Sequence, residues 1–150
     1  MAIDLTVEKF TTPEPITVSE DMSIDDLQRL MATNDIRHLP VVREERVVGV
    51  ISDRDVRVVA GLTYAERFQV TAGDLMTPDP LIVNANARLD EVALAMSERK
   101  AGSAIVLDAD GKLLGIFTAT DALNALIEIV RGDDVSEERL ELTNCTKNAR

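Results

Sequence analysis

Thr12-Pro13-Glu14-Pro15-Ile16-Thr17-Val18 introduces a pattern that returns 65 positions later as Thr77-Pro78-Asp79-Pro80-Leu81-Ile82-Val83. The same offset aligns residues 24–27 with 89–92 and residues 39–42 with 104–107. After one extra residue in the turn at 108–111, residues 49–55 align with residues 115–121 at an offset of 66. An insertion that is confined to a turn is typical of two copies of one fold. The chain therefore contains an internal repeat.

Each copy has the same predicted order of elements. Apolar residues recur at helical spacing in two segments, which follow Ser23 in the first copy and Asn86 or Arg88 in the second. Two short β-branched runs come next, at residues 39–42 and 47–51 and again at 104–107 and 113–117. A second helix is predicted to begin near Asp53 and again near Ala119. The pattern indicates an α/β (α+β) fold in which helices pack on strands.

The repeat divides the chain into four predicted parts. The first copy is predicted at residues 7–60 and the second at residues 74–130. A connector at residues 61–73 separates them, with a helical turn expected around residues 64–68. Residues 131–150 form a charged tail that holds the only cysteine, Cys145. Neither copy is long enough to bury a sufficient core alone, so we expect the two to share one.

Composition limits the classes of partner. The 16 basic and 27 acidic side chains give a net charge of −11, which repels nucleic acid and anionic membranes. No run of 18 apolar residues and no signal-like N-terminus occurs. One cysteine allows neither an intrachain disulfide nor a Cys-based zinc site. We expect a cytoplasmic protein that binds neither nucleic acid nor membranes.

Two equivalent segments place a hydroxyl three residues before a carboxylate at the end of a predicted strand: Ser52 before Asp55, and Thr118 before Asp121. One interpretation is helix capping, in which the hydroxyl and the acid satisfy free backbone N–H groups at a helix start. The other is a nucleotide site, because a helix N-terminus attracts phosphate and a carboxylate accepts hydrogen bonds from both hydroxyls of a ribose. The residues alone leave both interpretations open.

In combination these segments resemble the cystathionine-β-synthase (CBS) domain family. The resemblance covers residues 7–130 and rests on the two Thr-Pro-x-Pro entries, on residues 37–42 and 102–107, and on residues 49–55 and 115–121. It implies two tandem β-α-β-β-α repeats paired through their sheets, called a Bateman module, with two clefts for adenine ligands such as AMP, ADP, ATP or S-adenosylmethionine. It also implies a regulatory or sensor role without catalysis, and no required cofactor.

The resemblance also assigns residues to each cleft. Asp55 and Asp121 are expected to hold ribose hydroxyls, with Ser52 and Thr118 near ribose or phosphate. The first cleft is expected to comprise Arg37, His38, Ser52, Arg54, Asp55, Thr77, Leu81 and Ser103. The second is expected to comprise Thr12, Ile16, Ile36, Arg37, Thr118, Thr120 and Asp121. The first cleft has the larger number of cationic groups, so we expect it to suit phosphates better.

Other functions fit the residues less well. His38 and Cys145 are far apart in the sequence, and no partner set for a nucleophile occurs, which argues against an enzyme. Asp108 and Asp110 resemble part of a calcium loop that lacks its later glutamate, so no metal is expected. The competing hypothesis is a dimerisation scaffold whose clefts have lost their ligand. In both cases the apolar helix faces predict a closed homodimer, and a sensor of this kind must act on an effector protein that the sequence does not identify.

Overall fold

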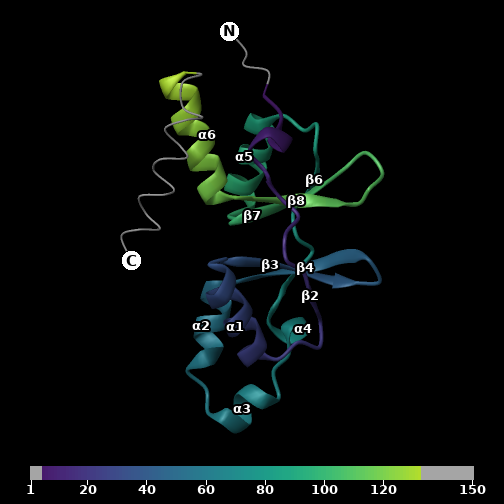
Figure 1. The fold of residues 1–150 in the computed structure, drawn as a ribbon, viewed down its shortest axis with the longest axis vertical. Helices are drawn as coiled ribbons and strands as arrows, with labels where there is room; N and C mark the ends of the chain where they lie inside the picture. The colour runs from purple at the N-terminus through teal and green to yellow at the C-terminus, as the bar shows by residue number, and fades with distance from the viewer. Residues whose placement is uncertain (1–4, 133–150) are drawn as a thin grey trace.

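Two four-stranded sheets lie at the middle of the molecule, with helices on their outer sides (Figure 1). The computed structural model describes residues 5–132; Cys145 and the predicted tail from residue 133 onward lie outside them. One sheet has the order β2 (Val18–Ser19), β3 (His38–Arg43), β4 (Arg46–Ser52) and β5 (Thr77–Pro78). The other has the order β1 (Thr12–Pro13), β8 (Leu113–Thr118), β7 (Ser103–Leu107) and β6 (Ile82–Asn84).

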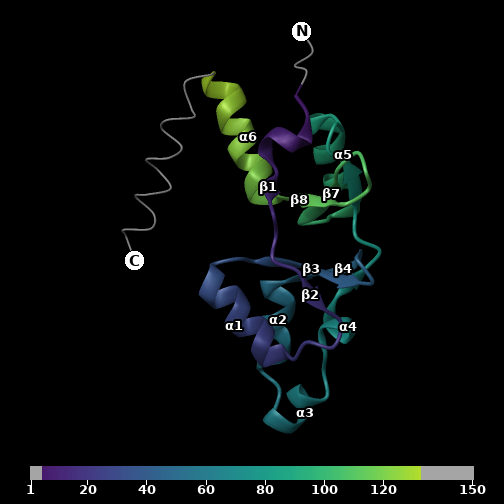
Figure 2. The same cartoon turned by 45° about the vertical axis from the view of Figure 1, so that its right-hand side comes forward.

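The helices complete two similar halves. The first half, residues 16–78, has α1 (Ile24–Asn34), α2 (Asp53–Ala60), α3 (Tyr64–Phe68) and α4 (Ala72–Leu75). The second half, residues 5–13 and 81–132, has the 3-10 helix η1 (Val7–Phe10), α5 (Leu89–Arg99) and α6 (Ala119–Arg131). Figure 2 shows the two halves one above the other, with the sheets facing each other. The predicted α/β (α+β) class with two paired repeats is confirmed.

The first helix of each half begins and ends as the sequence requires. Ser23 is the N-cap of α1, and its side chain accepts a hydrogen bond from the Asp26 N–H at 3.2 Å. Of the two candidates for the second copy, Arg88 is the N-cap of α5, and its side chain makes no capping hydrogen bond. Both helices end at a residue in the left-handed region, Asp35 with φ 51° and Lys100 with φ 53°. The repeat therefore extends to the backbone conformation of the helix ends.

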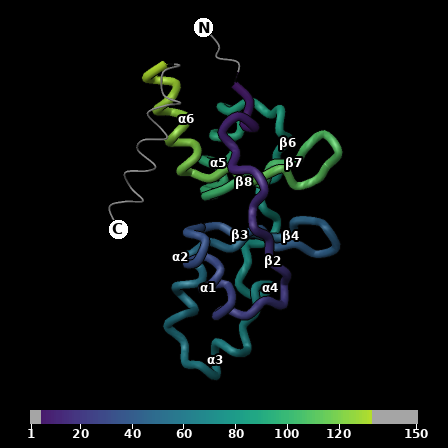
Figure 3. Tube along the Cα trace, viewed as in Figure 1, coloured from purple at the N-terminus to yellow at the C-terminus, as the bar shows by residue number. Residues whose placement is uncertain are grey.

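Each half completes its sheet with a strand from the other copy of the repeat. β1 pairs with β8, so that Thr12 lies opposite Ile116, and β5 pairs with β4, so that Thr77 lies opposite Val50. The segments beside these strands are exchanged as well. The Val7 N–H donates to the Ala87 carbonyl at 2.9 Å, and the Ala72 N–H donates to the Met22 carbonyl at 2.9 Å. The trace in Figure 3 follows both crossings between the halves.

The expectation of one shared core is wrong: the structure has two separate cores, and the exchanged segments contribute to both. Val7 and Phe10 of η1 are buried in the core of the second half, and Ala72 of α4 is buried in the core of the first. The remaining buried members of the first core are Val18, Ile24, Leu27, Met31, Leu39, Val41, Ile51, Val56 and Val59. Those of the second are Leu89, Val92, Met96, Ala104, Val106, Phe117 and Ala125. Neither core is complete without residues from the other copy of the repeat, which ties the two copies together.

Two equivalent glycines allow the exchanged strands to approach. Gly49 lies opposite Pro78, and Gly115 lies opposite Pro13. A Cβ atom at Gly115 would overlap the backbone carbonyl of Thr12, and one at Gly49 would lie 2.9 Å from the carbonyl oxygen of Thr77. Any side chain at these positions would push the exchanged strand away from its sheet. The aligned glycines of the repeat are therefore required by the crossings.

We predict that Gly115→Ala destabilises the protein by about 1–3 kcal/mol, because the added methyl group meets backbone rather than a side chain that could move. The melting temperature should fall by roughly 3–10 °C. Gly61→Ala is the matched control, since Gly61 has φ −76° and its nearest other atom would be 3.8 Å from a Cβ. Thermal unfolding followed by circular dichroism measures both, and equal melting temperatures for the two variants would contradict the close approach.

Candidate functional site

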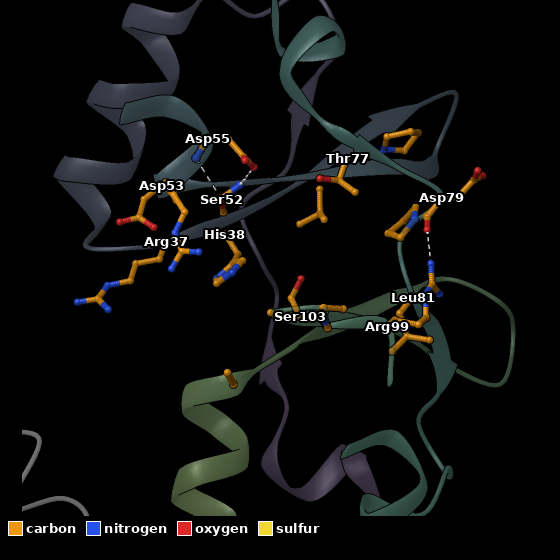
Figure 4. A pocket seen from close by; sticks show the side chains of 18 of the residues that line it. Arg37, His38, Ser52, Asp53, Asp55, Thr77, Asp79, Leu81, Arg99 and Ser103 are labelled. Carbon is orange, nitrogen blue, oxygen red and sulfur yellow. Dashed lines mark hydrogen bonds between the residues drawn. The ribbon is translucent and has the colours of Figure 1, made fainter. Parts of the chain in front are cut away.

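A cavity of about 590 Å³ opens between the two halves. It is lined by residues of β4, α2 and β5 from the first half and by the start of β7 and of α6 from the second (Figure 4). All eight residues predicted for the first cleft line it, namely Arg37, His38, Ser52, Arg54, Asp55, Thr77, Leu81 and Ser103. The structure therefore brings together residues that lie up to 66 positions apart in the sequence.

Ser52 and Asp55 form a capping box at the start of α2. The Ser52 N–H donates to Oδ2 of Asp55 at 2.9 Å, and the Asp55 N–H donates to Oγ of Ser52 at 3.2 Å. The capping interpretation is therefore correct. It does not exclude the other, because Oδ1 of Asp55 has no hydrogen-bond partner within residues 5–132 and the half-buried side chain lines the cavity. The carboxylate can cap its own helix with one oxygen and accept a ligand hydroxyl with the other.

Asp121 has a more enclosed environment. It forms the equivalent capping box with Thr118, whose N–H donates to Oδ2 at 2.9 Å, and it is only 8% exposed. Its second oxygen, Oδ1, accepts a hydrogen bond from the Thr12 hydroxyl at 3.5 Å. No such contact from Thr77 to Asp55 occurs in the described part of the chain. The two carboxylates therefore differ in how much acceptor capacity they offer a ligand.

The structure does not gather the other residues predicted for the second cleft around Asp121. Ile16 and Ile36 pack against the core of the first half. Arg37 and Thr120 line the cavity beside Asp55. Thr120 lies there because the adjacent Ala119 N–H donates to the Gly102 carbonyl at 3.0 Å, which holds the start of α6 at the cavity edge. Of the seven residues, only Thr12, Thr118 and Asp121 are joined by hydrogen bonds.

The cavity has charged residues that the sequence analysis did not assign to it. Arg99 and Lys100, at the end of α5, line it together with Asp53 and Asp79. Nη2 of Arg99 donates to the Asp79 carbonyl at 2.8 Å and so holds the Thr77–Leu81 wall. Asp79 itself has φ 52°, as its repeat equivalent Glu14 has φ 49°. The sequence contained a signal for the two cations, because they lie four and three positions before Ser103, which was expected at this cleft.

His38 begins β3 and reaches the other half. A Cβ atom at Gly102 would lie 3.2 Å from Nε2 of His38, so the imidazole packs against the backbone of the second half. Burial lowers the pKa of His38 from its ordinary value of 6.5. Asp53, Asp55 and Asp121 raise this pKa, and Arg37 lowers it further, but the effect of burial is larger. This position therefore favours the neutral form of the imidazole.

Comparison with known proteins identifies the family. The sequence profile of the CBS domain matches residues 7–60 and 72–128. The chain belongs to the CBS domain family. The CBS pair is 29% identical over 155 residues to the chloroplastic CBS domain-containing protein CBSX2 of Arabidopsis thaliana; the match covers 84% of this chain and 65% of CBSX2. It is also 32% identical over 114 residues to an inosine-5'-monophosphate dehydrogenase of Korarchaeum cryptofilum, of which it covers 23%.

Solved structures give the same result. The crystal structure of CBSX2 superposes with a TM-score of 0.72 at 33% identity, covering 87% of this chain and all of that one. A structure of CBSX2 in complex with AMP superposes with a TM-score of 0.70 at 34% identity, covering 83% of this chain and 97% of that one. Within the described part of this CBS pair, no helix is long and apolar enough to cross a membrane.

The acidic turn predicted not to bind metal has a local structural role. Oδ1 of Asp108 accepts hydrogen bonds from the Asp110 N–H at 2.9 Å and from the Lys112 N–H at 3.0 Å, which close the turn between β7 and β8. Among residues 5–132, no three His, Cys, Asp or Glu side chains lie close enough together to hold a metal ion. The extra residue of the second repeat is therefore accommodated in an ordinary turn.

We predict that His38 makes the unliganded protein sensitive to acid. Because its pKa is lower in the folded than in the unfolded chain, the unfolded chain binds more protons as the pH falls below about 6.5, and stability is lost in that window. Between pH 7.5 and pH 5.5, the melting temperature of His38→Gln should fall by less than that of the natural chain. Parallel melting-temperature profiles would show that burial does not disfavour the charged imidazole.

Proposed function

We propose that this CBS pair is a regulatory sensor that binds adenine nucleotides between its halves and passes the signal to a partner protein. The observation that carries the proposal is Asp55, which lines a cavity of about 590 Å³ with cationic groups from both halves and whose Oδ1 has no hydrogen-bond partner within residues 5–132. A cavity of this volume is in the range of small-molecule sites. The AMP complex of CBSX2, at 34% identity, supports an adenine ligand.

Each part of the nucleotide has a matching group. Asp55 would accept hydrogen bonds from the ribose hydroxyls, and Leu81 and Ser103 would contact the adenine ring. The phosphates would meet Arg37, His38 and Arg54 beside the N-terminus of α2, where cationic side chains and the positive end of the helix dipole favour an anion. A local cationic cleft is needed because the chain carries a net charge of −11, which disfavours anions at longer range.

The Asp121 site is a weaker candidate for the same ligand. Its carboxylate is almost buried, and a ribose would have to displace the Thr12 hydroxyl from Oδ1. In the second half the repeat equivalents of Arg37 and His38 are Gly102 and Ser103, which carry no charge. We therefore propose that AMP, ADP or ATP binds first beside Asp55, with S-adenosylmethionine as a further adenine ligand to test.

The proposed role is regulatory rather than catalytic. This chain covers the whole solved chain of CBSX2, a CBS-pair protein, whereas the dehydrogenase match covers only 23% of that enzyme. The nucleotide would act as a regulatory ligand, and no other cofactor is proposed. A cytoplasmic location, an effector protein as partner, and the absence of nucleic-acid and membrane binding remain predictions from the sequence.

We also propose a homodimer formed through the helices. Large apolar side chains are exposed on α2, α5 and α6, namely Val58, Leu94, Leu123, Leu126, Ile127, Ile129 and Val130. Val130 is 76% exposed and Leu123 is 61% exposed, which is costly for a monomer in water. A two-fold dimer would cover the same face of both copies. A ligand-free dimerisation scaffold remains the competing function.

The sharpest prediction separates helix capping from ribose binding at the two aspartates. Asp55→Asn keeps an oxygen for the Ser52 N–H, so the unliganded protein should lose at most about 1 kcal/mol. Its affinity for AMP should fall roughly 10- to 150-fold, equivalent to about 1.5–3 kcal/mol, because Asn cannot accept from both ribose hydroxyls. Asp121→Asn is the matched control and should leave the tight phase of binding intact. Titration calorimetry measures both.

A ligand without the 2'-hydroxyl tests the same contact. The natural chain should bind 2'-deoxy-AMP more weakly than AMP, and Asp55→Asn should not discriminate between them.

Binding of AMP should also stabilise the fold. AMP at about 100 times Kd should add roughly 2.7 kcal/mol to the free energy of unfolding and raise the melting temperature by about 5–10 °C. If AMP, ADP, ATP and S-adenosylmethionine all leave the melting temperature unchanged at millimolar concentration, the scaffold is the better account.

The dimer is tested by light scattering at micromolar concentration. The natural chain should have about twice the mass of one 16.4 kDa chain, with or without AMP. Leu126→Glu combined with Val130→Glu should give a monomer, because two charges would then face the partner. Phe68→Glu is the control, since Phe68 is 80% exposed but lies on α3, away from the proposed interface. A monomeric natural chain would refute the dimer.

A further inference from the structure

His38 places an imidazole at the wall of a cavity. It is the only histidine of the chain, it is half-buried, and it lies where the two halves meet (Figure 4). Neither of its ring nitrogens has a hydrogen bond to another residue within the described range 5–132. The imidazole lies so close to Gly102 that a side chain at position 102 would have no room. Neither ring nitrogen is therefore held by a protein hydrogen bond within residues 5–132, and a ligand in the cavity can supply a partner.

Charged groups of both signs face this imidazole. Asp53 and Asp55 act on it from the start of α2, Asp121 acts from α6, and Arg37 precedes it in the chain. Arg54, Arg99 and Lys100 line the same cavity. The repeat equivalent of His38 is Ser103, which is 6% exposed, lines the cavity and cannot take up a proton to become a cation. The titrating group is therefore present once in each chain.

We propose that His38 enables the cleft to distinguish phosphorylated adenosine from adenosine, by taking up one proton from solvent when a 5'-phosphate enters. The inference rests on the proposed function, because it assumes that an adenine nucleotide binds beside Asp55. A phosphate within about 4–6 Å of an imidazole stabilises the imidazolium by roughly one to three pKa units. The hydrogen bond from an imidazolium to phosphate is also stronger than that from a neutral ring.

The physical advantage of histidine lies in the empty state. An arginine at position 38 would keep its charge in a half-buried site whether or not a ligand is present, at a cost in desolvation. Burial already holds the pKa of His38 below 6.5 in the unliganded chain, so the neutral ring avoids that cost. The charge then forms only when a phosphate compensates it. Nucleotide affinity should consequently rise as the pH falls from 8.5 toward 6.5.

The single histidine permits a direct measurement without any variant. In the chain without an affinity tag, only one imidazole ring titrates in the proton NMR spectrum, and the shared midpoint of its two C–H resonances is the pKa of His38. Saturating AMP should raise this pKa by at least about one unit, which corresponds to a tenfold effect of protonation on affinity, whereas adenosine should not raise it. An equal pKa with AMP and with adenosine would overturn the inference.

Calorimetry with a matched pair of variants gives an independent test. AMP is titrated at pH 7.0 in two buffers of different ionisation enthalpy, which gives the number of protons taken up. His38→Gln should remove the uptake and weaken AMP binding roughly three- to fivefold at pH 6.5 but less than twofold at pH 8.5. Arg54→Gln should weaken binding at both pH values and keep the uptake, because arginine does not titrate.

The outcomes separate the two levels of the proposal. AMP binding with the same proton count in the natural chain and in His38→Gln would overturn the role of His38 and leave the proposed function intact. That comparison also subtracts the proton that the phosphate itself exchanges, since its second pKa is near 6. Failure of the natural chain to bind AMP, ADP or ATP at any pH would overturn the proposed function, and this inference with it.

Discussion

The exchange of short strands between the two halves is the constraint on which the rest of the structure depends. β1 and β5 each contribute two residues, yet they complete sheets to which the other copy of the repeat supplies the long strands. The exchange places Thr77 and the following wall beside Ser52 and Asp55, and it places Thr12 beside Asp121. Gly49 and Gly115 make the crossings possible by allowing backbone to lie against backbone. One copy of the repeat alone would therefore lack both a complete core and a complete site.

The capping boxes connect fold stability to ligand recognition. At the start of α2, one oxygen of Asp55 satisfies the backbone of its own helix, which fixes the direction of the other oxygen. A carboxylate held in this way loses little side-chain freedom when it accepts a ligand hydroxyl. At Asp121 the second oxygen, Oδ1, already accepts a hydrogen bond from the Thr12 hydroxyl. Two copies of one sequence pattern thus give two sites of unequal character.

Local patterns were predictable, and contacts across the molecule were less so. The helices after Ser23 and the hairpins at 39–51 and 104–117 follow from periodicity and turn residues, which act over a few positions. The exchange of β1 and β5 could not be read from two-residue strands, because their pairing depends on tertiary packing. Arg99 and Lys100 were missed because they reach the cavity only when α5 ends in a left-handed residue beside Asp79. Thr120 lies beside the Asp55 cavity because a backbone hydrogen bond to Gly102 holds α6 there.

A crystal structure of the protein with AMP tests the central claim most directly. The claim is that the cavity between the halves, and not a surface of either half, is the nucleotide site. It predicts density for one AMP with its ribose at Oδ1 of Asp55, its phosphate toward His38 and Arg54, and its base beside Leu81 and Ser103. AMP bound outside this cavity, or an empty cavity in crystals grown with saturating AMP, would contradict it.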